Sequence, residues 1–249
     1  MKYYILESNW STIFSFLKSQ KGLHTNNESK LRIFIEAVYY ILKTGVQWMY
    51  IPSYYGCGRA IHKRYKYWAD KGLWCDLMNY VSDKDTQQVM IDSLSVKAHA
   101  CASGYEINGN ETHALGRSVG GFTTKIHALT DALGNPIKFI LTPGNTHDII
   151  PTKDLLEGIT HSKVLADKAY FSEENVKFIT NNSNEVVIPS KSNYTKDHSI
   201  DWHVYKERHL IENFFSKIKH FRRVFSRFDK TCSAFLGFIS LASTFIWLR

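Results

Sequence analysis

The sequence has only four cysteines in 249 residues, and none of them belongs to a C-x-x-C pair. A C-x-x-C pair provides two of the four ligands in a common zinc finger, so a structural zinc site of that kind is not expected. The simplest interpretation is a reduced protein with inert thiols, so we expect a cytoplasmic location.

Long apolar runs are also missing. The N-terminus has one lysine, a short apolar patch and then Glu7, which is not the pattern of a signal peptide. The most apolar stretch, Phe235 to Leu248, is shorter than the roughly 20 residues of a membrane span and contains glycine and serine. We interpret it as a buried C-terminal helix, with a membrane-surface segment as a minor alternative, and expect no membrane partner.

Positive charge is what the sequence has in excess. The formal net charge is +8, and 44% of the residues are hydrophobic, which is enough for a proper core. A basic surface raises the affinity for nucleic acid or anionic lipid without specifying either. From charge alone, a basic protein with no such partner is an equally good interpretation.

The first 82 residues predict a small helical region. Residues 7–18 and 29–44 have helical periodicity, and Gly45 is placed to end the second helix. After a turn-rich connection, residues 59–70 form a third helix, with tyrosine and tryptophan between its basic residues Arg59, Lys63, Arg64 and Lys66. This order favours a helix-turn-helix-like DNA-binding region; an ordinary helical bundle with a solvated basic face is equally open.

Residues 83–249 predict an α/β domain. The expected strands are 88–96, 122–130, 136–142, 163–166 and 185–189, and the expected helices are 149–158, 172–181 and the segment that starts at Tyr205. Residues 99–121 read as a loop. Three strands followed by alternating helices and strands is the order of a ribonuclease H-like fold.

Three acidic residues stand where an α/β unit can present ligands. Asp92 lies inside an apolar strand, where an ionised carboxylate needs compensation. Asp167 ends another apolar strand, and Glu212 lies on the helix that starts at Tyr205. Asp131 reads as a turn residue, and Asp148 as an N-cap that could also support the site. Three carboxylates favour a hard cation, Mg²⁺ with Mn²⁺ as the alternative.

Cations accompany Glu212. Tyr205, Arg208, Glu212 and Lys219 fall within about 60° on an ideal helical wheel, opposite an apolar face. Arg208 and Lys219 could therefore hold phosphates. Arg208 and Glu212 also have the spacing of an ordinary i to i+4 ion pair, and both interpretations can hold together.

These residues carry a resemblance to a known family. V-M-I-D-S at Asp92, L-A-D-K-A-Y at Asp167 and the pattern Y-x-x-R-x-x-x-E-x-x-x-x-x-x-K from Tyr205 resemble bacterial insertion-sequence transposases of the DDE class with a Tyr-Arg-Glu-Lys signature. G-G-F-T-T-K-I-H-A-L-T-D and F-I-L-T-P-G-N-T-H-D are similar as well. The resemblance covers nearly the whole chain and departs from the family at Val119, where relatives often carry a basic residue.

The resemblance implies a ribonuclease H-like core behind a DNA-binding region, with Asp92, Asp167 and Glu212 as metal ligands. It implies that Tyr205, Arg208 and Lys219 lie near the DNA of the element's ends, and that two ends are paired by at least a dimer. The implied reaction frees a 3′-hydroxyl and joins it to double-stranded target DNA without a covalent intermediate. Tyr205 as a recombinase nucleophile is a weak alternative. A magnesium-dependent nuclease and an inactive DNA-binding repressor are the other two hypotheses.

Overall fold

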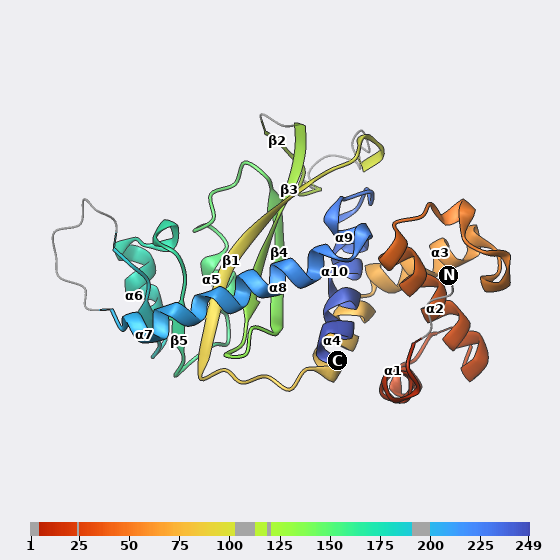
Figure 1. The fold of residues 1–249 in the computed structure, drawn as a ribbon, viewed down its shortest axis with the longest axis horizontal. Coiled ribbons are helices and arrows are strands. Elements are labelled where there is room, and N and C mark those ends of the chain that lie inside the picture. Colours follow the sequence, from red (N-terminus) through yellow and green to blue (C-terminus); the bar gives the residue numbers. More distant parts are fainter. Residues whose placement is uncertain (1–4, 24, 103–112, 119–120, 191–199) are drawn as a thin grey trace. The chain divides into compact units, whose positions relative to one another are not determined.

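The computed structural model describes residues 5–23, 25–102, 113–118, 121–190 and 200–249. The chain forms two compact units (Figure 1). One comprises Met1–Ser82, His99–Tyr105 and Ile218–Arg249, and the other comprises Asp83–Ala98 and Glu106–Lys217. We call them the helical unit and the sheet unit.

The helical unit is built from short amphipathic helices and one apolar helix. Its α-helices are α1 Glu7–Ser19, α2 Glu28–Thr44, α3 Gly58–Asp70, α4 Leu73–Val81, α9 Arg222–Phe225 and α10 Cys232–Trp247. Short 3₁₀ turns are η1 Trp48–Tyr50, η2 Ser53–Tyr55 and η3 Ala100–Ala102. Gly45 ends α2 in the left-handed conformation and donates its N–H to Ile41, as predicted.

The core of the helical unit forms where α10 packs on α3 and α4. Tyr65 of α3 is fully buried, stacks on Phe238 and donates its hydroxyl to the Ala234 carbonyl oxygen at 2.6 Å. Gly237 comes so close to the Trp74 and Tyr65 side chains that a Cβ there would lie 2.9 Å from each. The apolar C-terminal stretch is therefore a buried helix, as predicted. Among the described residues, none of the helices combines the length and apolar character that crossing a bilayer requires.

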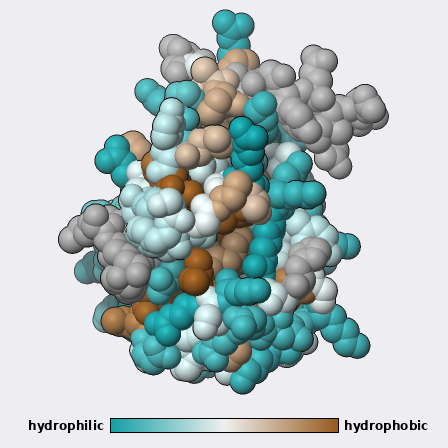
Figure 2. Space-filling view, turned by 90° about the vertical axis from the view of Figure 1, so that its right-hand side faces the viewer, coloured by the Kyte–Doolittle hydropathy of each residue, from teal (hydrophilic) through white to brown (hydrophobic). Residues whose placement is uncertain are grey.

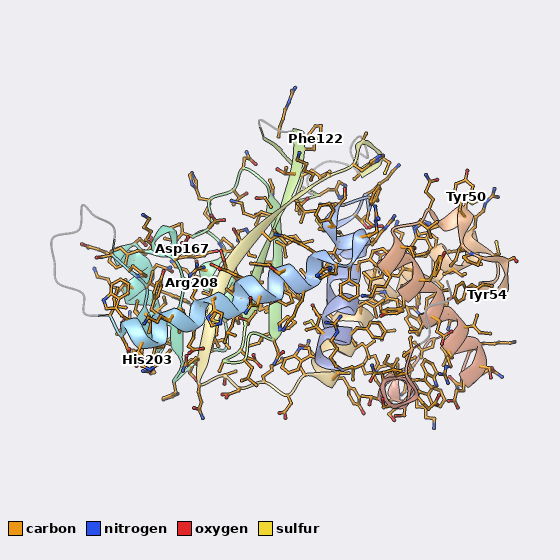
Figure 3. The ribbon with its side chains drawn as sticks, in the orientation of Figure 1. Tyr50, Tyr54, Phe122, Asp167, His203 and Arg208 are labelled. Atoms are coloured by element: carbon orange, nitrogen blue, oxygen red, sulfur yellow. The ribbon has the colours of Figure 1, made fainter. Side chains whose placement is uncertain are left out.

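The surface of this unit is mostly hydrophilic, with apolar side chains gathered in the middle of the face shown in Figure 2. Ile33, Met49, Tyr50 and Tyr54 are among the exposed large hydrophobic residues of the unit. Tyr50 and Tyr54 come from the connection between α2 and α3 (Figure 3).

The sheet unit contains a mixed sheet. Its strands are β1 Gln88–Lys97, β2 Gly116–Ser118, β3 Gly121–Thr130, β4 Pro136–Pro143, β5 Lys163–Leu165 and β6 Glu185–Val187. β3 pairs antiparallel with β1, β2 and β4, while β5 is parallel to both β1 and β6. This is the mixed α/β, ribonuclease H-like arrangement that the order of elements predicted, although β2 lies in a stretch expected to be a loop.

Helices cover the two faces of this sheet. The helical elements are α5 Thr152–Leu155, η4 Lys168–Tyr170, α6 Glu173–Asn181, α7 Trp202–Tyr205, η5 Lys206–Arg208 and α8 His209–Lys219. One face packs Val89 and Ile91 of β1 against α5 and α6. On the other face, Phe214 of α8 stacks on Phe139 of β4. Successive strand residues point to opposite faces, so this two-sided cover decides where each polar residue of β1 lies.

Three local predictions met different outcomes. Ser172 caps α6 by accepting the Asn175 N–H, which confirms that cap. The expected helix over 149–158 is only the short α5. The expected continuous helix from Tyr205 is interrupted by η5, whose tighter winding rotates each residue by about 20° more than an α-helix does. The ideal helical wheel drawn from the sequence is therefore distorted around Arg208.

Candidate active site

Asp92 is the centre of the candidate site. It follows Ile91 on β1, so when Ile91 enters the core under α5 and α6, Asp92 points to the face that α8 covers. Its Oδ1 accepts the N–H of Ser93 at 2.7 Å. The Asp92 side chain is 22% exposed, so it can be reached from solvent but is largely desolvated.

Arg208 and Glu212 face Asp92. Arg208 Nη1 lies 3.4 Å from Asp92 Oδ2, and Arg208 Nη2 donates to Glu212 Oε1. The i to i+4 ion pair considered from the sequence is therefore present, but the same guanidinium also contacts a carboxylate from the sheet. Glu212 is 52% exposed and stays open to solvent.

Asp167 lies just after the carboxyl end of β5, the strand parallel to β1. Its Oδ1 accepts the N–H of Ala169 at 2.7 Å and so caps the η4 turn. Figure 3 labels Asp167, from the segment after β5, and Arg208, from η5. Electrostatically, Asp167 belongs to the site, because its charge acts on Asp92.

The surroundings of Asp92 make this carboxyl harder to ionise. Burial, together with the charges of Asp167 and Glu212, raises the pKa of Asp92 to about 6. The Ser93 N–H and the Arg208 guanidinium act in the opposite direction. Burial lowers the pKa of Arg208, but Glu212 and Asp92 outweigh this effect, so the net pKa of Arg208 is raised. Such a cluster of coupled carboxylates is typical of a site for a cation.

The three carboxylates are of the chemical type that binds a hard cation. The distances between them in this structure are too long to hold one. Within the part of the chain that the structure describes, no three His, Cys, Asp or Glu side chains converge closely enough to hold a metal ion. The guanidinium of Arg208 provides positive charge between Asp92 and Glu212 instead. The three carboxylates, on separate elements, nevertheless provide oxygen atoms, the type of ligand that hard divalent cations prefer.

A second polar cluster supports β1 from the opposite face. Ser93 Oγ donates to Asp148 Oδ1 at 2.6 Å, and Lys125 Nζ lies 2.9 Å from the same oxygen. Lys125 also donates to the Thr146 carbonyl oxygen at 2.7 Å. Burial raises the pKa of Asp148, but its bonds to Ser93 and Lys125 outweigh this and the net pKa is lowered. Asp148 is therefore not an N-cap, because α5 begins only at Thr152.

His127 and Tyr170 complete this supporting cluster. His127 is fully buried, its Nε2 lies 2.8 Å from Thr142 Oγ1, and burial lowers its pKa to about 4. Tyr170 is buried as well, and burial followed by the charges of Asp92 and Asp148 raises its pKa. The sequence analysis did not select these residues. Lys125 and His127 lie two positions apart in a strand whose other residues are apolar, glycine or threonine, and that signal could have found them.

Tyr205 and Lys219 have weaker ties to the site. Tyr205 stacks edge-on against Trp202 at 5.5 Å between ring centroids, and its charge would act on Arg208. Lys219 is exposed at the end of α8. Val119 lies outside the described residues.

The basic residues of α3 divide into two kinds. Arg59 and Lys63 are exposed, and Lys66 is partly buried. Arg64 instead donates to the Leu23 carbonyl oxygen at 2.9 Å and lies over the rings of Phe34 and Trp68, at 4.4 and 5.0 Å. Burial lowers the pKa of Arg64. The guanidinium of Arg64 therefore stabilises packing inside the helical unit.

Comparisons with known proteins agree with the geometry. Residues 83–244 match the model of the family described as "Transposase DDE domain", and residues 5–78 match "Putative transposase of IS4/5 family". A Brucella ovis protein described as "Putative transposase for insertion sequence element IS6501" is 42% identical over 132 residues, covering 51% of this chain and 99% of its own length. "Uncharacterized protein y4sN" of Sinorhizobium fredii is 30% identical over 103 residues, covering 39% of this chain and 79% of its own length.

Among solved structures, the piggyBac transposase in a synaptic complex with hairpin DNA superposes with a TM-score of 0.52 at 11% identity. The match covers 98% of this chain and 72% of that one, and at this identity it bears on the fold alone. The family match spans more than half of the sequence, including Asp92, Asp167 and Glu212. The chain therefore belongs to the insertion-sequence transposases that carry a DDE domain.

Proposed function

We propose that the chain binds the terminal inverted repeats of its own element, cuts at the ends and joins the freed 3′-hydroxyl to target DNA. The observation that carries this proposal is the contact of Arg208 with both Asp92 and Glu212. A guanidinium shared by two carboxylates is matched to a phosphate, because phosphate oxygens can replace the carboxylates as its partners.

Asp92, Asp167 and Glu212 are the residues that would hold Mg²⁺, or Mn²⁺ in its place. A pair of such ions supplies activation of a hydroxyl and stabilisation of the leaving oxygen in phosphoryl transfer. Arg208, which contacts both Asp92 and Glu212, would hold a phosphate of the DNA backbone beside these ligands. Tyr205 and Lys219 would contact the same strand, and no residue of the chain forms a covalent bond with DNA.

The helical unit is the proposed holder of the inverted repeats. The exposed Arg59 and Lys63 and the partly buried Lys66 lie on one helix whose other face is packed in the core. Exposed basic side chains bind DNA phosphates regardless of the base sequence. Pairing two element ends requires at least two copies of the chain, which we place inside the cell on its own DNA.

The deciding experiment is strand transfer in vitro. Pre-cleaved ends from the DNA flanking the gene are mixed with supercoiled plasmid, Mg²⁺ and purified protein, and joined products are counted. We expect joining by the wild type and none by Asp92→Asn or Glu212→Gln. Glu157→Gln, on the exposed Lys138–Glu157 pair, is the matched control and keeps wild-type activity. Cutting without joining would identify a nuclease, and DNA binding without cutting would identify a repressor.

A further inference from the structure

A cavity of about 570 Å³ lies within the helical unit, whereas Asp92, Asp167 and Glu212 belong to the sheet unit. It opens between η1, α3 and the connection from α9 to α10, with η3 and the residue before it at its edge. Its size is in the range of sites for small organic ligands.

Two stacked ring pairs line this cavity. Trp48 stacks on His62 with 4.8 Å between centroids and an angle of 28°. His99 stacks on Phe228 with 5.0 Å and 30°. Burial lowers the pKa of His62, which keeps that ring uncharged near neutral pH. The flat faces of aromatic rings are suited to a planar, aromatic ligand.

The charges around the cavity favour an anionic group on that ligand. Its lining includes three cations, Lys66, Arg223 and Lys230, and one carboxylate, Asp229. Arg223 Nη2 lies 2.9 Å from Asp229 Oδ1 in a buried pair, which cancels two of these charges. Lys66 adds a positive charge to the lining beyond this pair.

We propose that this cavity binds one unstacked nucleotide of single-stranded DNA. The base lies against the aromatic pairs, and its phosphate lies near Lys66. This inference rests on the proposed function, since cutting DNA produces strand ends whose last nucleotide can leave the stack. A base inside an intact duplex cannot expose its face to such a cavity, so the site selects single strands.

The first test measures dissociation constants by fluorescence anisotropy in the absence of metal ions. The two labelled probes are a single-stranded oligonucleotide of twelve deoxythymidines and a duplex of the same length. His99→Ala removes one ring and Lys66→Gln one cation. Each is expected to weaken single-strand binding about tenfold and duplex binding less than twofold. Lys63→Gln, also on α3 but outside the cavity lining, should show the reverse pattern. Unchanged single-strand affinity of both cavity variants overturns the proposal.

A second measurement uses the native cysteines and does not depend on folding of any variant. Cys101 lines the cavity and is exposed, while the exposed Cys57 lies at the start of α3 outside it. Single-stranded oligonucleotide should slow the reaction of Cys101 with N-ethylmaleimide at least fivefold relative to Cys57, as measured by peptide mass spectrometry. Equal protection of both cysteines, or none of Cys101, contradicts the proposal.

The source of the nucleotide is settled in the same assay. Protection of Cys101 by deoxythymidine monophosphate at the oligonucleotide's own concentration would identify a site for free nucleotides and overturn the assignment to DNA. Asp92→Asn should retain full single-strand affinity. If the wild type fails to join strands while Cys101 is still protected, the result counts against the proposed function alone. If the wild type joins strands but Cys101 is not protected, the result counts against the cavity alone.

Discussion

Arg208 Nη1 lies 3.4 Å from Asp92 Oδ2, although 116 positions separate the two residues in the sequence. The contact joins the helical segment after residue 200 to the central strand of the sheet. It also holds positive charge where Asp92, Asp167 and Glu212 would otherwise repel one another. The guanidinium of Arg208 therefore supplies the counter-charge for Asp92 and Glu212 in this structure.

Replacing Arg208 by glutamine should lower the free energy of unfolding at pH 7 by about 1 kcal/mol, since two partly buried carboxylates lose their counter-charge. The loss should shrink at pH 5. The pKa of Asp92 is raised to about 6, so at pH 5 this carboxyl is mostly protonated and needs Arg208 less. Urea denaturation at both pH values measures the effect. An equal loss at pH 5 and 7 would contradict the assigned pairing.

Asp148→Asn should destabilise the protein by about 1–3 kcal/mol and reduce strand transfer. Lys125, only 13% exposed, would lose the partner of its charge, and Ser93 would lose a charged acceptor directly beside Asp92. Chemical denaturation and the joining assay measure the two effects. The comparison is Glu157→Gln, in a pair where Glu157 is 80% exposed, which should cost less than 1 kcal/mol. Similar costs for both substitutions would show that Asp148 has no supporting role.

The features of the fold and site that depend on neighbouring residues could be predicted from the sequence. Asp92 in an apolar strand, Ser172 as a cap and Gly45 as a helix end are decided by neighbours a few residues away, and each lies as the pattern indicated. The cap predicted at Asp148 is wrong because α5 begins only at Thr152, and Asp148 Oδ1 instead contacts Ser93 and Lys125, from strands that the local sequence does not contain.

Contacts distant in sequence also explain the other differences. Arg64 looks like its basic neighbours on α3, yet it is held by Leu23 and Phe34 from earlier segments. The short helix α4 has no place in the expected element order, and its apolar side chains are covered chiefly by α10, more than 150 residues later. No periodicity within one segment carries this information.

His127 should make stability depend on pH. The pKa of His127 is lowered to about 4 in the folded protein and is near 6.5 when unfolded. Between these values the unfolded state binds the extra proton, so folding stability falls as the pH drops from 6.5 to 4, by up to about 1.4 kcal/mol per unit. Asp92, with its raised pKa, acts oppositely between about pH 6 and 4.

The wild type must therefore be compared with His127→Gln, in which only the histidine contribution is gone. The difference in unfolding free energy between the two should fall steadily from pH 7 to pH 4, as measured by urea denaturation at each pH. A constant difference across this range would show that His127 titrates normally in the folded protein.

Gly134→Ala should destabilise the sheet unit more than Gly158→Ala. Both glycines have left-handed backbones, with φ of 78° and 81°. A Cβ at Gly134 would lie 2.9 Å from both Cβ and the carbonyl oxygen of Leu210, whereas at Gly158 it meets nothing within 4 Å. Gly158→Ala should cost about 1 kcal/mol from backbone strain alone, and Gly134→Ala at least about 1 kcal/mol more. Thermal denaturation compares them, and equal costs would contradict the close approach.

Lys63→Gln and Arg64→Gln should affect different properties, although the residues are neighbours on α3. Lys63 is exposed, so its loss should leave the stability unchanged. It should reduce the slope of the logarithm of the duplex-binding constant against the logarithm of the salt concentration by about one unit. Arg64→Gln removes a hydrogen bond to Leu23 and two ring contacts, and should instead lower the unfolding free energy by about 1–2 kcal/mol. Anisotropy titrations from 50 to about 200 mM salt, with denaturation of each variant, separate the two effects. If Arg64→Gln changed the salt slope as strongly as Lys63→Gln without loss of stability, the guanidinium would belong to the DNA surface and not to the core.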